Sequence, residues 1–449
     1  MKNSKPSQKS SKRSLQKNQL DYKSIAHWFA IGFFLGDKNF TNSRFTSIAQ
    51  FGPNIDWHYS PKRNISFSDV LDNFSSIIES LLKRNLGSRK IILPLSGGLD
   101  TRTLAAALFG NKNIVTFSYE FEGGINETGY ARQIAEASGW EFNEYKISNG
   151  YLWRKIEELA KLNYCQSDFT HPRQMAVIES ISGLGDILLS GQWGDVLFDN
   201  FDIDKDANID FQTNFVLNKI VKIGGMELAN KLWECWGLAG SFEDELFELV
   251  QNLLVDIKIS NPISRIRAFK SIHWAKRWAN PNLNIFSKYT EMYIPFYSDE
   301  ICNFICSTPE KYLKNRKVQI EYIKSKAPTL ARIPWQEYDL DLYQFQYFNS
   351  IYFPRRIYRY GKRIIREKIL KKPRLITRNY ELQFLGKNNE KKLEKWLFNN
   401  PKISSIIPFD ILSEYYGKFK NVDPVKYSHP LSMLLTFSLW CHKNNSIKD

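Results

Sequence analysis

Cysteine is scarce in this sequence of 449 residues, which contains five cysteines at scattered positions. An odd number without a repeated short spacing excludes a disulfide framework of the kind that staples small secreted domains. Cys302 and Cys306 lie four residues apart, but no second Cys/His pair completes a zinc site. We therefore expect buried thiols in a reducing compartment.

Long apolar runs are also missing. No stretch approaches the roughly 18 apolar residues of a membrane span. The N-terminus carries positive charge without the apolar core of a signal peptide. These absences predict a cytoplasmic protein. The length of the chain and its hydrophobic content of 43% allow two or three domains and a sizeable core.

Acidic residues are missing where basic residues concentrate. Residues 1–20 hold six Lys/Arg and no acid, and residues 355–378 hold eleven against one acid. These segments carry +6 and +10, so the rest of the chain has a net charge of −1 within the total of +15. A nearly neutral body argues against a nucleic-acid partner. Residues 1–20 lack apolar periodicity, and we expect them to be disordered.

The basic segment 355–378 interleaves its charges with apolar side chains. One interpretation is contact with an anionic membrane surface, which would place the protein peripherally at the inner membrane face. A second is contact with a polyanionic substrate, and a third is a solvated helix. The sequence leaves all three open.

Strand and helix patterns alternate through the middle of the chain. Strands are expected at 91–95, 113–121, 141–147 and 186–190, and helices at 66–86, 102–109, 127–138, 150–162 and 172–182. This alternation predicts an α/β fold, a parallel sheet with helices on both faces. Residues 205–345 and the C-terminal region read as mostly helical. A ligand would bind at the carboxyl ends of the strands.

The stretch 95–101, Leu-Ser-Gly-Gly-Leu-Asp-Thr, follows the first strand and opens a helix. Its two glycines let the backbone approach an anion, and the helix start offers free N–H groups with partial positive charge. The acid at position 100 would repel phosphate unless it held a Mg²⁺ that the phosphates share. The expected nucleotide-binding residues of this loop are Ser96, Gly97, Gly98, Asp100 and Thr101.

A second turn, Ser190-Gly191-Gln192-Trp193-Gly194-Asp195, follows the fourth strand. In a parallel sheet the carboxyl ends of both strands lie at one edge, so Asp195 can face the same crevice as Asp100. We expect these two carboxylates to hold one Mg²⁺, which would neutralise charge on a leaving pyrophosphate.

The motif Ser-Gly-Gly-Leu-Asp-Thr resembles the pyrophosphate-binding loop of N-type ATP pyrophosphatases, the PP-loop superfamily. The wider pattern is similar to asparagine synthetase and its relatives. This resemblance implies an adenine nucleotide alpha hydrolase-like fold that uses ATP and Mg²⁺ to activate a carboxylate as an acyl-adenylate. It also implies that Leu95, Tyr119, Ser190 and Gly191 bracket the adenine and ribose.

The sequence departs from the family pattern at three positions of the second turn. Gln192 stands where Glu is usual, Trp193 where Gly is usual, and Val196 replaces the last acid. As a candidate catalytic residue, Gln192 can donate a hydrogen bond but cannot act as a base. Either the substrate differs from aspartate or catalysis is weakened.

A phosphate-site lysine, which the family usually places after Ile333-Pro334, is absent. Arg102, in the first turn of the loop helix, is the candidate catalytic cation that could replace it. Lys288 and Arg332 are weaker candidates. We expect His171 to be structural.

The glutaminase domain that opens the family's sequences is largely missing, because its nucleophile would be a cysteine directly after the initiator Met and Lys2 stands there. The expected domains are a disordered basic tail (1–20), a β-rich remnant resembling the end of a glutaminase domain (21–62), an asparagine synthetase-like ATP pyrophosphatase domain (63–345) and a basic helical region (346–449).

The resemblance implies an ATP-dependent ligase that forms an amide on a small-molecule or sugar carboxylate. Its nitrogen would come from free ammonia, a separate glutaminase or another amine. The alternative is a catalytically degenerate ATP-binding scaffold in surface-polysaccharide biosynthesis. A tRNA-thiolating enzyme is disfavoured, because no cysteine pair lies near the loop.

Overall fold

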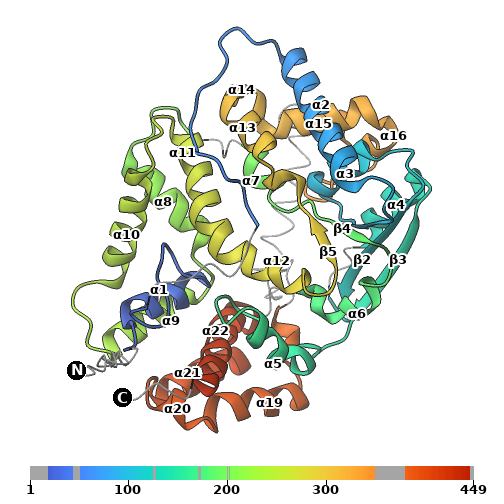
Figure 1. The fold of residues 1–449 in the computed structure, drawn as a ribbon. Helices are drawn as coiled ribbons and strands as arrows, with labels where there is room; N and C mark the ends of the chain where they lie inside the picture. Colours follow the sequence, from blue (N-terminus) through green and yellow to red (C-terminus); the bar gives the residue numbers. More distant parts are fainter. Residues whose placement is uncertain are drawn as a thin grey trace, which may run out of the picture.

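A computed structural model describes residues 19–43, 51–124, 128–169, 173–199, 201, 203–348 and 380–444. Its centre is a five-stranded parallel sheet in the order β3-β2-β1-β4-β5 (Figure 1). The strands are β1 (Ile91–Pro94), β2 (Ile114–Phe121), β3 (Glu141–Ile147), β4 (Ile187–Leu189) and β5 (Glu291–Tyr293). The predicted α/β class is confirmed, and so is the mostly helical C-terminal part.

The strand order reverses beside β1. The chain runs from β1 outward to β2 and β3, then returns to place β4 on the other side of β1. Ile91 of β1 accordingly pairs with Ile114 on one side and Ile187 on the other. Ligands of open parallel sheets bind outside the carboxyl ends of the strands at such a reversal. The turns that follow β1 and β4 both begin there.

Four helices around the sheet position the turn that follows β1: α2 (Phe67–Leu86), α3 (Leu99–Ala107), α4 (Thr128–Ser138) and α15 (Lys317–Lys326). Helix α4 packs on β2 and β3, and α15 packs against α2 and α3. The predicted capping box is present at the start of α2, where Ser66 and Asp69 satisfy each other's backbone N–H groups.

The remaining helices surround this unit and form the C-terminal region (Figure 1). They are α5 (Leu152–Leu162), η1 (Arg173–Ala176), α6 (Ile178–Ile181), α7 (Gly194–Phe198), α8 (Ile209–Ile220), α9 (Gly225–Cys235), α10 (Phe242–Asp256), α11 (Pro262–Phe269), the π-helix η2 (Lys270–Ala279), α12 (Asn280–Phe286), η3 (Pro295–Tyr297), α13 (Asp299–Ser307), α14 (Glu310–Leu313), η4 (Lys314–Arg316), α16 (Pro328–Ala331), α17 (Leu342–Phe345), η6 (Tyr380–Gln383), α19 (Lys387–Phe398), α20 (Pro401–Ser404), α21 (Phe409–Asn421) and α22 (Pro424–Lys443).

The β-rich character expected for residues 21–62 is wrong for the described residues. This segment begins with helix α1 (Tyr22–Ile31), capped by Asp21, and its only ladder contact there is an isolated bridge between Leu20 and Thr41. Every α1 residue from position 24 to 31 is buried, against α9 and α22. A helix that is apolar all round shows no 3.6-residue stripe, so its pattern was mistaken for strands.

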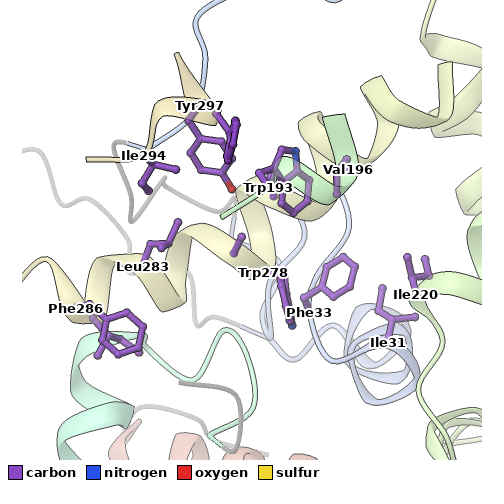
Figure 2. Packing of buried hydrophobic residues seen from close by; sticks show 14 of the residues in the cluster. Ile31, Phe33, Trp193, Val196, Ile220, Trp278, Leu283, Phe286, Ile294 and Tyr297 are labelled. Carbon is purple, nitrogen blue, oxygen red and sulfur yellow. The ribbon is translucent and has the colours of Figure 1, made fainter. Parts of the chain in front are cut away.

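The segment from Phe51 to Lys62 runs along α13 without forming a strand. The Ser60 and Lys62 N–H groups donate to the carbonyls of Cys306 and Ser307 at 3.0 and 3.1 Å. We call residues 51–62 the N-terminal strap. Figure 2 shows Ile31 and Phe33 in the same buried cluster as Ile220 and Trp278. Residues that precede the first strand in the sequence are therefore part of the same hydrophobic core as the sheet.

Strand β5 is not among the predicted strands, because it lies within residues 205–345, which are expected to be mostly helical. Its three residues pair with β4 in register from Ile187–Glu291 to Leu189–Tyr293. An edge strand this short gives no alternating pattern to detect.

Several predictions lie outside the described residues: the disorder expected for 1–18, the role of the basic segment 355–378 and that of His171. The domain boundaries at 20, 62 and 345 stay predictions. All five cysteines are free, and all except Cys235 are buried. Across the described ranges, no helix combines the length and the apolar character needed to cross a bilayer.

Candidate functional site

The turn after β1 is held by its own hydroxyls. The Ser96 N–H donates to Thr101 Oγ1 at 3.3 Å, and the Gly98 N–H donates to Ser96 Oγ at 3.3 Å. Helix α3 then starts with Gly98 at its N-cap position and no side-chain cap. Its first N–H groups lack the side-chain acceptor that usually covers them, which leaves an anion-binding helix start.

The turn after β4 lies directly against the first turn. A Cβ added to Gly191 would stand 3.0 Å from the Thr101 nitrogen, and one on Gly194 would collide with the Asp100 carboxylate. Trp193, between these glycines, takes a left-handed φ of 78°. Only residues without side chains fit at positions 191 and 194, so these glycines bring the two turns together.

Asp100 and Asp195 lie at one site. Both line a cavity of about 420 Å³ at the carboxyl ends of β1 and β4. Burial raises the pKa of the Asp100 carboxyl, the Arg316 guanidinium opposes this rise, and the Asp195 carboxylate adds to it. The Asp195 carboxylate is therefore close enough to act on Asp100 electrostatically.

The cavity gathers nearly all of the expected site residues. Its lining includes Leu95, Ser96, Gly98, Asp100, Thr101, Tyr119, Ser190, Gly191, Gln192 and Asp195. Gly97 is not part of the lining: its carbonyl accepts a hydrogen bond from the Gln336 N–H at 3.2 Å, and a Cβ there would meet the Gln336 side chain. Arg173, Gln174, Trp193 and Gln336 also line the cavity and were not predicted.

Arg102 does not face the cavity, which corrects its predicted role as the phosphate-site cation. Its side chain has no exposed surface, and its guanidinium donates to the carbonyls of Ile333 and Pro334 at 2.6 and 2.9 Å. It also donates to the Gly97 carbonyl at 3.3 Å. Burial lowers the pKa of Arg102 to about 10. Arg102 thus ties the first turn to the 330–334 segment as a structural residue.

We expect Arg102→Ala to lower the free energy of unfolding by about 3 kcal/mol, because several buried carbonyls lose a charged donor. Urea unfolding of the two proteins measures this difference. The matched control is Arg84→Ala, whose side chain is 61% exposed in a pair with Glu300 and should leave the unfolding midpoint unchanged. Equal midpoints for both variants would contradict the structural role.

Arg316 supplies the cation that the sequence analysis missed. It forms an ion pair with Asp100, and its side chain is 12% exposed. Gln319 supports the pair by donating to Asp100 Oδ1 at 3.2 Å. Asn315 and Arg316 both take left-handed φ values, 55° and 59°. Left-handed backbone at two successive residues without glycine is uncommon, and no sequence motif marks it here, so Arg316 could not be predicted.

Lys270 is a second buried cation near the acids. Burial lowers its pKa to about 8, and the Asp195 carboxylate opposes that shift. Its Nζ lies 4.5 Å from the Phe201 ring centroid, at the first residue of π-helix η2. The weaker candidates do not contribute to the cavity: Lys288 is exposed, and Arg332 lies over the Tyr343 ring.

The donor set fits a magnesium ion shared with phosphates better than a metal held by protein alone. Among the residues that the structure describes, no group of three or more His, Cys, Asp or Glu side chains gathers at one point. Mg²⁺ usually keeps several waters and takes one or two carboxylates plus substrate phosphates. Asp100 and Asp195 provide two such carboxylates, beside an uncapped helix start suited to phosphate.

An open parallel sheet with glycine turns at its reversal point defines an α/β nucleotide-binding protein. Residues 76–272, which include both turns, match the family model of asparagine synthase. Residues 76–272 therefore contain a domain similar to asparagine synthase, a family of ATP-dependent amide-forming ligases. A glutaminase domain is not detected in the chain. No curated protein matches the chain.

Proposed function

We propose that this protein adenylates a carboxylate with ATP, releases pyrophosphate and forms an amide, without glutaminase activity of its own. The observation that carries the proposal is the meeting of Asp100, Asp195 and Arg316 beside the uncapped start of α3. The two carboxylates and the Arg316 guanidinium match the needs of a polyphosphate and its metal.

In the first step, a carboxylate oxygen forms a bond to the α-phosphorus of ATP, and the bond to the β-phosphate oxygen breaks. Bound Mg²⁺, held by Asp100 and Asp195, would neutralise charge on the departing pyrophosphate. The N–H groups at the start of α3 would bind phosphate oxygens, and the Arg316 guanidinium would add positive charge. In the second step an amine nitrogen bonds to the acyl carbon, and AMP leaves with the electron pair.

Gln192 lines the cavity as a neutral amide. It can orient a substrate by donating or accepting hydrogen bonds, but it cannot take the proton that the amine loses. This difference from the family's usual Glu supports a substrate other than aspartate, such as a sugar acid. It is also the observation that favours the second candidate function, an ATP-binding scaffold in surface-polysaccharide biosynthesis.

Incubating the full chain with ATP, MgCl₂ and a panel of carboxylic acids, including aspartate and uronic acids, tests the proposal. We expect AMP and pyrophosphate to form in equal amounts and only with particular acids. ATP binding without cleavage by any acid would favour the scaffold instead. Formation of ADP and phosphate would overturn the proposed bond cleavage.

The remaining partners are proposals that follow from the sequence. The nitrogen would come from free ammonia, a separate glutaminase or a larger amine, and nucleic acid is not a partner. The basic segment 355–378 would bring a cytoplasmic protein into peripheral contact with the inner membrane face, or with a polyanionic substrate.

A further inference from the structure

The nucleotide cavity continues into a smaller cavity of about 170 Å³. The two cavities meet along five residues that line both of them: Tyr119, Arg173, Gln174, Ser190 and Gln192. Tyr119, Gln174 and Gln192 are partly exposed, so a ligand can reach their side chains. We call the smaller cavity the side cavity, and the five shared residues its mouth.

The side cavity lies at a different part of the sheet from the nucleotide cavity. Leu188 of β4 and Met292 of β5 contribute to it, whereas Pro94 of β1 and Phe117 of β2 contribute to the nucleotide cavity. The described residues that line the side cavity include neither acid of the metal site and no residue from the start of α3. A second reactant could therefore occupy the side cavity without displacing the phosphates.

The inner part of the side cavity, beyond its mouth, is apolar. Asn282 is the one amide there among the described residues, and both ends of its side chain are already bonded. Its Oδ1 accepts from Ser167 Oγ at 3.1 Å, and its Nδ2 donates to the Trp278 carbonyl at 2.8 Å. An ammonium or hydroxyl group placed there would lose its water and meet no unengaged oxygen, so the inner part favours an apolar carbon body. The other inner residues, three of which are labelled in Figure 2, are Leu188, Trp278, Ala279, Leu283, Phe286 and Met292.

The charge at the mouth is positive. Arg173 is the charged residue among the described residues that line the side cavity, and no carboxylate occurs with it. Its guanidinium lies over the Tyr119 ring, 5.7 Å from the ring centroid, which holds the charge where the two cavities meet. A carboxylate is attracted there, and the amides of Gln174 and Gln192 can donate hydrogen bonds to it. An ammonium group would meet a like charge and no anion.

We propose that the side cavity binds the carboxylate substrate, and that this substrate is an acid with an apolar carbon body and no ammonium group. The assignment rests on the proposed function. The carboxylate would lie at the mouth, where one of its oxygens can form the bond to the α-phosphorus. The bond from that phosphorus to the bridging oxygen would break with its electron pair on pyrophosphate, and the carbon body would fill the inner part.

This assignment narrows the carboxylates of the proposed function. Aspartate is disfavoured by its ammonium group, which the charges at the mouth repel. A sugar acid would have to keep its hydroxyl groups outside the side cavity, because the inner residues offer them no partner.

Calorimetric titration of the full chain tests the binding site. MgCl₂ and α,β-methylene ATP are present, because this analogue cannot be cleaved between its α- and β-phosphates. The probes are phenylacetate and phenylglycine, which differ by the ammonium group that phenylglycine carries at pH 7. We expect phenylacetate to bind about tenfold more tightly than phenylglycine.

Gln174→Glu places a carboxylate at the mouth with almost no change of shape. It should weaken phenylacetate binding about tenfold, because like charges repel, and weaken phenylglycine binding far less, because the ammonium group gains an anion. The preference for phenylacetate should therefore disappear. A general loss of folding would weaken both probes equally and leave their ratio unchanged. The control Gln133→Glu, at an exposed position of α4, should change neither affinity.

Equal affinities for the two probes, or a preference that Gln174→Glu leaves intact, would overturn the assignment. Loss of phenylacetate binding on addition of α,β-methylene ATP would also overturn it, because the nucleotide would then occupy the side cavity. Pyrophosphate release separates this failure from that of the proposed function. Release with aspartate but with no apolar acid would keep the ligase and refute the substrate class. Phenylacetate binding without release by any acid would support a ligand site but contradict its substrate role and the proposed function.

Discussion

Arg316→Ala should lower acid-dependent pyrophosphate release by about 100-fold, the scale on which single charge-stabilising donors act in active sites. Its guanidinium forms an ion pair with Asp100, one of the two acids of the site. Its removal takes positive charge from the leaving pyrophosphate. It also removes the interaction that opposes the raised pKa of Asp100, so the pH optimum should move upward.

Two further variants separate this role from a general loss of charge. Arg316→Lys should restore part of the rate, because a point charge remains without the fork of donors. Arg332→Ala removes an exposed arginine from a nearby segment and should change little. Pyrophosphate assays of all three variants provide the comparison. Equal rates for the alanine variants at positions 316 and 332 would show that Arg316 does not act at the site.

Acid should destabilise this fold strongly through its buried histidines. His27 is 5% exposed, and neither ring nitrogen has a hydrogen-bond partner in the described part of the chain. Burial lowers its pKa from 6.5 to about 4. Burial lowers the pKa values of His273 and His429 in the same direction.

Between pH 6.5 and 4 the unfolded chain binds more protons at His27 than the folded chain does, so stability falls as pH falls through this window. The expected loss from His27 alone is about 2 kcal/mol at pH 5. Urea unfolding at pH 7.5 and pH 5 measures it. His27→Leu should flatten the pH dependence by that amount, whereas His58→Gln, at an exposed position, should not. Parallel pH profiles for the wild type and His27→Leu would refute the assignment.

The sequence predicted the sheet well because its signals are local. Apolar runs, the capping box at Ser66 and Asp69, and glycines after β1 and β4 each report on neighbouring residues. The meeting of Asp100 and Asp195 also followed, since parallel strands end at one edge of a sheet. Tyr119, near the carboxyl end of β2, and Gln192, in the turn after β4, line the cavity because they lie at the same edge of the sheet.

The predictions that failed at the site concern contacts between segments that are far apart in the sequence. Arg102 had the right place on α3 for a phosphate cation, but its guanidinium donates to carbonyls more than 200 residues away in the sequence. Arg316 reaches Asp100 from the N-terminal end of α15, across a similar separation. No local pattern marks such pairs. Helix α1 was missed for a different reason, because burial on all sides removes the periodicity on which prediction depends.

ATP affinity measured with magnesium and with EDTA tests most directly whether Asp100 and Asp195 hold one ion beneath the nucleotide. The proteins compared are the wild type, Asp100→Asn, Asp195→Asn and the double variant. We expect magnesium to tighten ATP binding in the wild type, each single variant to lose that gain, and the double variant to lose no more. In EDTA the variants should bind ATP at least as well as the wild type, because a repelling carboxylate is gone. Tightening by magnesium that survives in either single variant, or losses that add in the double variant, would contradict a shared ion.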